Sequence, residues 1–101
     1  MYTFIMRANA APGKLTELVG LWKTWNELSM RRFSWEGFKV MTTVGGSFSE
    51  VTCIWQAESL DEWQERSQML FTDPEISALA PKVGACILPN SLTTSILKPQ
   101  N

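Results

Sequence analysis

The sequence contains no histidine, and this absence removes several kinds of active site. A Ser–His or Cys–His nucleophile cannot form within one chain, and haem cannot take a His axial ligand. Only two cysteines are present, Cys53 and Cys86, and they are too few and too far apart in the sequence to predict a zinc site. We therefore expect no metal and no cofactor. Both thiols lie in apolar segments, where reduced core cysteines of a cytoplasmic protein are expected.

Charge and long apolar runs are also scarce. Charged residues make up 19% of the chain and the formal net charge is −1. Arg31-Arg32 is the one basic pair, and it is expected to be the solvated end of a helix. We therefore expect neither nucleic acid nor an anionic membrane surface as a partner. No apolar run approaches the roughly 20 residues of a membrane span, and no signal peptide is predicted.

Tryptophan, in contrast, is abundant. The 101 residues are enough for one domain, residues 1–101, and five of them are tryptophan. This is more aromatic surface than one small core requires. It indicates a subunit interface or an apolar pocket.

The stretch 50–68 changes its hydrophobic period in the middle. Val51, Cys53 and Trp55 alternate with their neighbours, as in a strand with one face on a core. Ser59 and Glu62 then have the spacing of a helix-capping box. We predict a strand that runs almost directly into a helix spanning residues 60 to about 71.

The first third of the chain has the same organisation. Residues 2–10 alternate as a strand, and Pro12-Gly13 ends it. From Lys14 onward, apolar residues recur at spacings of three and four, which predicts an amphipathic helix. The apolar positions are Leu15, Leu18, Val19, Trp22, Trp25 and Leu28.

The remaining segments complete a repeated pattern. Residues 38–44 and a strand beginning at Phe48 form a hairpin across Gly45-Gly46-Ser47. Asp73-Pro74-Glu75 starts a short helix that Pro81 is expected to break, and residues 91–97 form the last strand. The order strand–helix–strand–strand–helix–strand is the ferredoxin-like α+β arrangement. We predict a four-stranded antiparallel sheet of strand order 4-1-3-2, with both main helices on one face.

Several short motifs, taken together in order and spacing, resemble the NIPSNAP family. They are Pro12-Gly13-Lys14, Val44-Gly45-Gly46, Glu50-Val51 leading to Trp55, Ser59-Leu60 with Glu62, and Asp73-Pro74-Glu75 followed by Leu79 and Pro81-Lys82. The resemblance implies a dimeric α+β barrel, in which two ferredoxin-like subunits pack sheet against sheet. Relatives with this fold include cofactor-free monooxygenases, haem-degrading enzymes, dehydratases, isomerases and polyketide cyclases. One departure is Cys53, which stands where the family often has histidine.

The strands carry apolar residues at both even-numbered and odd-numbered positions, hence on both faces of the sheet. This pattern also predicts a homodimer. Phe4 and Met6 fall on one face and Ile5 on the other, and Ile54 falls opposite Val51 and Trp55. Because the helices cover one face only, a monomer would leave apolar surface in water. A symmetric sheet-to-sheet dimer would bury it.

The candidate site follows from the resemblance and the strand order together. Strands one and three are central neighbours, so Asn9 and Trp55 are expected to share a cleft between the sheet and the helices. In the haem-degrading and quinone-forming relatives with this fold, an Asn on strand one and a Trp on strand three are catalytic residues. Trp22, Trp25 and Trp63 are expected to enclose a flat ligand there. Core packing of Trp55 and turn capping by Asn9 are the structural alternatives.

Glu50 is a weaker candidate for catalysis. A strand carboxylate that faces a core is costly unless it is paired, for instance with Arg7 or Lys39. Otherwise Glu50 lies at the end of the sheet in water.

Two functions remain open. The first is a metal-independent enzyme without cofactor, of monooxygenase or isomerase/cyclase type, that acts on a small apolar or aromatic substrate. The second is a non-catalytic binding or assembly protein that uses the same cleft or the dimer surface. A polar group deep in an apolar pocket favours the enzyme, whereas a cleft filled with Trp and Met side chains argues against it.

Overall fold

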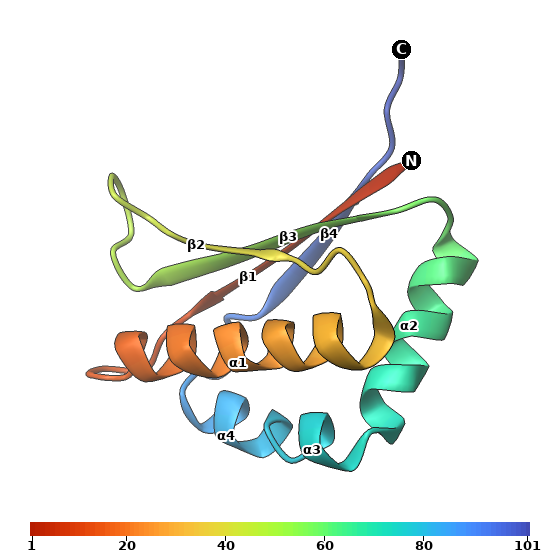
Figure 1. The fold of residues 1–101 in the computed structure, drawn as a ribbon. Helices are drawn as coiled ribbons and strands as arrows, with labels where there is room; N and C mark the ends of the chain where they lie inside the picture. Colours follow the sequence, from red (N-terminus) through yellow and green to blue (C-terminus); the bar gives the residue numbers. More distant parts are fainter.

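Four antiparallel strands form one sheet in the order β2-β3-β1-β4 (Figure 1). The computed structural model describes residues 1–101. Its strands are β1 (Tyr2–Asn9), β2 (Lys39–Thr42), β3 (Glu50–Ala57) and β4 (Thr93–Leu97). Every neighbouring pair is antiparallel, and the order is the predicted 4-1-3-2. The ferredoxin-like α+β fold is therefore confirmed, although residues 43–49 of the β2–β3 hairpin form a longer loop than the sequence predicted.

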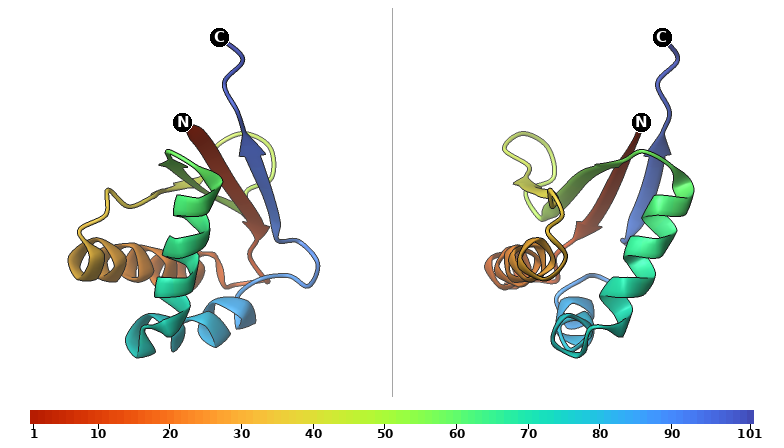
Figure 2. Two further views of the ribbon diagram at one scale, coloured as in Figure 1. Left: turned by 90° about the vertical axis from the view of Figure 1, so that its right-hand side faces the viewer. Right: turned by 45° about the vertical axis from the view of Figure 1, so that its right-hand side comes forward.

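The helices are α1 (Leu15–Phe33), α2 (Leu60–Thr72), α3 (Pro74–Ser77) and α4 (Ala80–Ala85). All four lie on one side of the sheet, and the other side carries none (Figures 1 and 2). Pro81 was expected to break a helix, but it lies in the first turn of α4 instead. Proline fits there because a first-turn N–H has no intrahelical acceptor to lose. No helix has the length and apolar character needed to cross a membrane.

Strand register decides which side chains face the helices. Phe4 pairs with Trp55, Met6 with Cys53, and Ala8 with Val51. Because successive strand residues point to opposite faces, all six share the helix-covered face. Four of them, Phe4, Ala8, Val51 and Cys53, are at most 1% exposed and form the centre of the core.

The open face of the sheet is mixed rather than uniformly apolar. Ile5 and Ile54 are directly paired at its centre, and Met41 and Leu97 lie further out, 43% and 50% exposed. Arg7, on the same face, pairs with Thr52 and Thr93. Apolar residues of both parities are thus present as expected, but charged and hydroxyl side chains lie among them.

Helix α2 is held at its N-terminus by side-chain caps. Ser59 Oγ accepts a hydrogen bond from the Glu62 N–H at 3.1 Å, as the capping box predicts. The Glu62 carboxylate reaches back to the N–H of Glu58 at 2.6 Å, one residue earlier than the motif requires. None of the α2 side chains is buried. The caps therefore stabilise α2, whereas α1 is stabilised by packing Leu18, Trp22 and Leu28 into the core.

The C-terminal end of α2 is tied to α1 by charged groups. Asp73 Oδ1 accepts hydrogen bonds from the N–H groups of Glu75 and Ile76, both at 3.0 Å. Its Oδ2 pairs with Arg32 at 2.5 Å, and Arg32 also contacts Glu75 at 2.9 Å. Arg32 is exposed in the last turn of α1, as expected for a solvated helix end, and α3 brings two carboxylates to it there.

Candidate functional site

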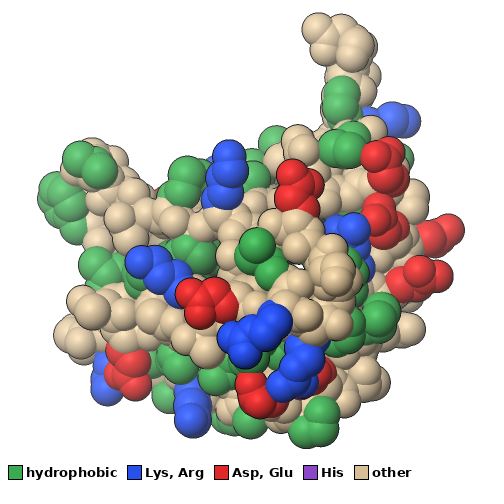
Figure 3. Space-filling model, viewed as in Figure 1, with side chains coloured by type: hydrophobic (Ala, Val, Ile, Leu, Met, Phe, Trp, Pro, Cys, Tyr) green, Lys and Arg blue, Asp and Glu red, His purple; other side chains and the backbone are tan.

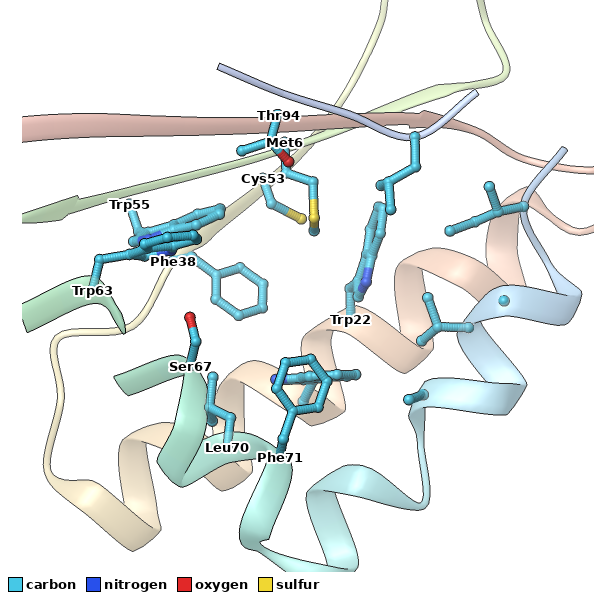
Figure 4. Close-up of a pocket in the computed structure, with 16 residues that line it drawn as sticks. Met6, Trp22, Phe38, Cys53, Trp55, Trp63, Ser67, Leu70, Phe71 and Thr94 are labelled. Carbon is cyan, nitrogen blue, oxygen red and sulfur yellow. The ribbon is translucent and has the colours of Figure 1, made fainter. Parts of the chain in front are cut away.

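A cavity of about 410 Å³ lies between the sheet and the helices (Figure 4). Its walls come from β1, β3 and β4, from α1, α2 and α4, and from the segments that precede β2 and β4. Of the 16 lining residues 13 are hydrophobic, so the walls are almost wholly apolar. The lining residues are Met6, Trp22, Trp25, Phe38, Cys53, Trp55, Trp63, Ser67, Leu70, Phe71, Ala80, Val83, Gly84, Ile87, Leu92 and Thr94.

Helix α2 contributes a whole side of this cavity. Trp63, Ser67, Leu70 and Phe71 recur at helical spacing on its inner surface. The sequence pattern that predicted an amphipathic helix is therefore correct, but its apolar stripe faces a cavity rather than packed core. This is why α2 has no buried side chain.

Aromatic rings form the largest part of the walls. Trp55 and Trp63 both stack on the buried ring of Phe4, with centroid distances of 5.5 and 5.3 Å and interplanar angles of 8° and 16°. Phe38 meets Trp55 edge-on at 6.4 Å. Such contacts fix ring orientation beyond what burial alone would do. The rings on this side of the cavity are therefore held in fixed orientations.

No charged side chain lines the cavity. The polar groups on its walls are the hydroxyls of Ser67 and Thr94, the thiol of Cys53 and the tryptophan N–H groups. Burial raises the pKa of the Cys53 thiol to about 12. The thiol is therefore protonated at neutral pH and is not a nucleophile there.

A smaller recess of about 70 Å³ lies behind the aromatic wall. It shares Phe38, Trp55 and Leu70 with the main cavity, and Trp35 and Arg66 also line it. The Arg66 guanidinium lies 5.3 Å from the Trp35 ring centroid and contacts the Glu62 carboxylate at 2.6 Å. The cation that lines this recess is thus already engaged by a ring and a carboxylate.

Several acidic residues gather at the start of α2. Figure 3 shows Asp and Glu side chains gathered at the right of the molecule, over the start of that helix. Asp61 and Glu62 lie in its first turn, where they stabilise the helix dipole. These carboxylates therefore have a structural role and lie outside the cavity walls.

Four of the predicted site residues come together. Trp22 and Trp25 from α1, Trp55 from β3 and Trp63 from α2 all line the one cavity. Figure 4 shows Trp55 and Trp63 at one end of the cavity and Trp22 across from them.

Asn9 is not with them, and the expectation that Asn9 and Trp55 share a cleft is wrong. Asn9 pairs with Glu50 at the end of β1, whereas Trp55 pairs with Phe4. Asn9 also has the opposite parity to Phe4, so its side chain leaves the sheet on the open face. Its Oδ1 accepts hydrogen bonds from Ser47 at 3.4 Å and Ser49 at 3.3 Å, which holds the hairpin loop to β1.

Glu50 also lies away from the cavity. It is the first residue of β3, it is half-buried, and it pairs with Asn9 across the strands. No ion pair joins it to Arg7 or Lys39. Of the two positions considered for Glu50, the structure places it at the end of the sheet.

Sequence reasoning did not assign Phe38, Cys53 or Ser67 to the site. Met6 and Cys53 are a cross-strand pair whose sulfur atoms both point into the cavity (Figure 4). Ser67 left a signal in the sequence, because it is the one polar residue in the stripe formed by Leu60, Trp63, Leu70 and Phe71. Elsewhere, no three Cys, Asp or Glu side chains lie together as metal ligands would.

The fold and the cavity define a ferredoxin-like α+β protein with an apolar chamber between its sheet and its helices. The NIPSNAP family profile matches residues 6–100, nearly the whole chain. The chain therefore belongs to the NIPSNAP family, as its motifs predicted. No curated protein sequence matches it.

Solved structures agree on the fold. A NIPSNAP family protein from Agrobacterium tumefaciens has a TM-score of 0.83 and 23% identity, covering 99% of this chain and 93% of that chain. A NIPSNAP domain protein from Burkholderia xenovorans has a TM-score of 0.78 and 15% identity, covering 98% and 94%. A Nitrosomonas europaea protein, whose name proposes an antibiotic biosynthesis monooxygenase, has a TM-score of 0.77 and 11% identity over 100% of both chains.

Proposed function

We propose that this NIPSNAP protein binds a small, flat, apolar or aromatic molecule in the cavity between its sheet and its helices. One observation carries the proposal: a cavity of about 410 Å³ whose walls include six aromatic side chains and no charged group. Ligand pockets are typically of this size and are largely apolar, with a few polar groups that fix orientation. The indole rings of Trp55 and Trp63 suit a flat ring system that can stack against them.

As an enzyme, the protein would act without metal or cofactor, as a monooxygenase or as an isomerase or cyclase. The walls offer no carboxylate, no histidine and no ionised thiol, so the reactivity has to come from the substrate. An electron-rich phenol with an activated CH₂ group is reactive enough. Loss of a proton gives an anion that reacts with O₂, and the resulting C–OOH loses water to leave C=O. The Nitrosomonas europaea protein with the same fold is named for a monooxygenase activity.

The second candidate is a protein that binds the same molecule without changing it. The scarcity of polar groups on the walls favours this alternative, because general acid–base chemistry requires a titratable group within hydrogen-bond reach. The two candidates share the ligand class and differ in turnover. A ligand recovered unchanged after incubation with the protein in air favours binding alone.

We also propose that two copies pack through the open face of the sheet, in the cytoplasm. Ile5 and Ile54 form the apolar centre of that face, and Met41 and Leu97 extend it. The two buried free thiols suit a reducing compartment.

Native mass spectrometry of the purified protein, followed by ligand release, tests the proposed function. We expect one apolar or aromatic molecule per chain, and quenching of tryptophan fluorescence when it is added back to stripped protein. Trp55→Phe should weaken binding several-fold, because the indole ring is replaced by a smaller benzene ring. Asn9→Ala is the matched control and should leave the affinity unchanged. Equal loss in both variants would contradict the placement of the ligand in this cavity.

A further inference from the structure

Ser67 differs from four other hydroxyl residues in the helices. Thr24 Oγ1 donates to the carbonyl of Gly20 at 3.0 Å, and Ser29 Oγ donates to that of Trp25 at 2.8 Å. Thr72 and Ser77 donate in the same way to carbonyls three residues earlier. This backbone contact is the usual fate of a Ser or Thr hydroxyl inside a helix. Ser67 makes no such bond, although the carbonyl of Trp63 is in the corresponding position.

The free hydroxyl faces the apolar cavity. In Figure 4 the Ser67 Oγ points from α2 toward the end of the cavity formed by Trp55, Trp63 and Phe38. Ser67 is half-buried. Every fully buried side-chain oxygen or nitrogen in the protein has a hydrogen-bond partner. Because the Ser67 oxygen has none, it is not fully buried and borders open space. It lies where the cavity meets an outer recess along α2, because Trp63, Ser67 and Phe71 line both.

We propose that Ser67 is the polar anchor of the cavity and that it hydrogen-bonds an uncharged oxygen on the edge of a flat ring ligand. A ring stacked on the aromatic wall near Trp55 and Trp63 would bring its edge to the hydroxyl. Both a carbonyl and a phenol can pair with a serine, which donates one hydrogen bond and accepts others. The ligand class is therefore a phenol or an aromatic ketone. This inference rests on the proposed function and adds the recognition element.

The charges around the site argue against an acidic ligand. No Lys or Arg lines the cavity. Arg66 faces the smaller recess and is engaged by Glu62 and Trp35. A carboxylate in the cavity would lose its hydration without gaining a cation, which is costly. A neutral oxygen with one hydrogen-bond partner carries no such penalty.

Three naphthalene probes of nearly equal size separate the contribution of the hydrogen bond from that of ring stacking and from the cost of burying a charge. They are 2-naphthol, 2-methylnaphthalene and 2-naphthoate, and their affinities are measured at pH 7 by equilibrium dialysis. For the wild-type protein we expect 2-naphthol to bind about fivefold more tightly than 2-methylnaphthalene, the size of one neutral hydrogen bond. The charged 2-naphthoate should bind most weakly. In Ser67→Ala, the affinity for 2-naphthol should fall about fivefold and that for 2-methylnaphthalene should not change.

Ser77→Ala is the matched control, because Ser77 bonds its own helix and lies outside the cavity. It should leave all three affinities as in the wild type. Ala is a strong helix former, so Ser67→Ala should fold normally, and circular dichroism checks this.

Each outcome separates the two proposals. If all three probes fail to bind the wild-type protein, the proposed function is wrong and the role of Ser67 falls with it. If the probes bind but Ser67→Ala retains the wild-type preference for 2-naphthol, or loses both neutral probes equally, only the role of Ser67 is wrong. Tighter binding of 2-naphthoate than of 2-naphthol would assign recognition to a cation such as Arg66 instead.

Discussion

At the scale of single residues, Cys53 shows how the fold changes a side chain's chemistry. It pairs with Met6 in the sheet, it is fully buried, and it faces the cavity. The NIPSNAP resemblance expects a histidine in this place, which would titrate near neutral pH. Burial raises the pKa of the thiol to about 12, so Cys53 behaves as a small apolar residue.

This pKa predicts a loss of stability at alkaline pH. The thiol ionises near pH 9 in the unfolded chain and at about pH 12 in the folded one, so the unfolded chain binds fewer protons between these values. Stability that is fully present below pH 9 is therefore lost as the pH rises toward 12. At pH 10 the loss amounts to about 1.4 kcal/mol.

Guanidinium unfolding under reducing conditions at pH 8 and pH 10 measures this effect. The wild-type protein should lose about 1.4 kcal/mol more than Cys53→Ala between the two pH values. Comparing the two proteins cancels the titration of lysine and tyrosine. An equal loss in both would show that the thiol is not shielded from water.

At the scale of elements, α2 is defined by its ends. Ser59 and Glu62 hold its beginning, and the contact of Arg32 with Asp73 ties its end to α1. The hydrogen bond from the Ile76 N–H, together with Arg32, holds the pKa of the Asp73 carboxyl below its usual value. Asp73 therefore stabilises the folded chain above the carboxyl pKa of the unfolded state, and this contribution is lost as the pH falls through its folded pKa.

Two substitutions at Asp73 separate the cap from the charge. Asn retains capping but cannot pair with Arg32 as an ion, whereas Ala loses both contacts. We expect the stability order wild type, Asp73→Asn, Asp73→Ala at pH 7 in urea unfolding. The gap between the wild type and Asp73→Asn should narrow as the pH is lowered. A gap that stays constant down to acid pH would contradict the ionic contribution.

The sequence predicted these elements well because their signals are local. The alternation of Val51, Cys53 and Trp55 and the Ser59–Glu62 cap each span only a few residues. The ion pair of Arg32 with Asp73 spans 41 residues and leaves no local pattern. Only the folded structure shows that Arg32 and Asp73 are in contact.

The misplacement of Asn9 has a different cause. Strand order correctly made β1 and β3 neighbours, but sharing a cleft also requires matching parity and register. Trp55 lies opposite Phe4, five residues along β1 from Asn9, and Asn9 faces the other side of the sheet. A shift by one residue reverses the face of a strand side chain. The aromatic walls were easier to predict, since Trp22, Trp25 and Trp63 lie on the inner stripes of their helices.

At the scale of the whole molecule, the sheet has one covered face and one open face. The exposed hairpin tip adds Val44 and Phe48, 87% and 69% exposed, and Figure 3 shows hydrophobic atoms on this projection. Together with Ile5 and Ile54 at the centre of the open face, these exposed apolar residues support the proposed association with a second copy.

Charge placed at the centre of the open face should separate the copies. Sedimentation of the wild-type protein at micromolar concentration should give twice the 11.4 kDa chain mass. Ile54→Lys should shift it to the chain mass, because two like charges would meet across the symmetric interface. Thr16→Lys, on the exposed surface of α1, should leave the mass unchanged. A wild-type protein that sediments only as a single chain contradicts the dimer.

The lack of buried side chains on α2 has a consequence for how this protein can change over time. Its inner row borders the cavity and its ends are fixed by caps, so Ser67, Leu70 and Phe71 can be exchanged without opening voids in the core around Val51 and Leu18. At these α2 positions, ligand preference can then change with little effect on the stability of the fold. A lineage, or an engineer, can explore new ligands along one helix while the sheet and α1 keep the scaffold intact.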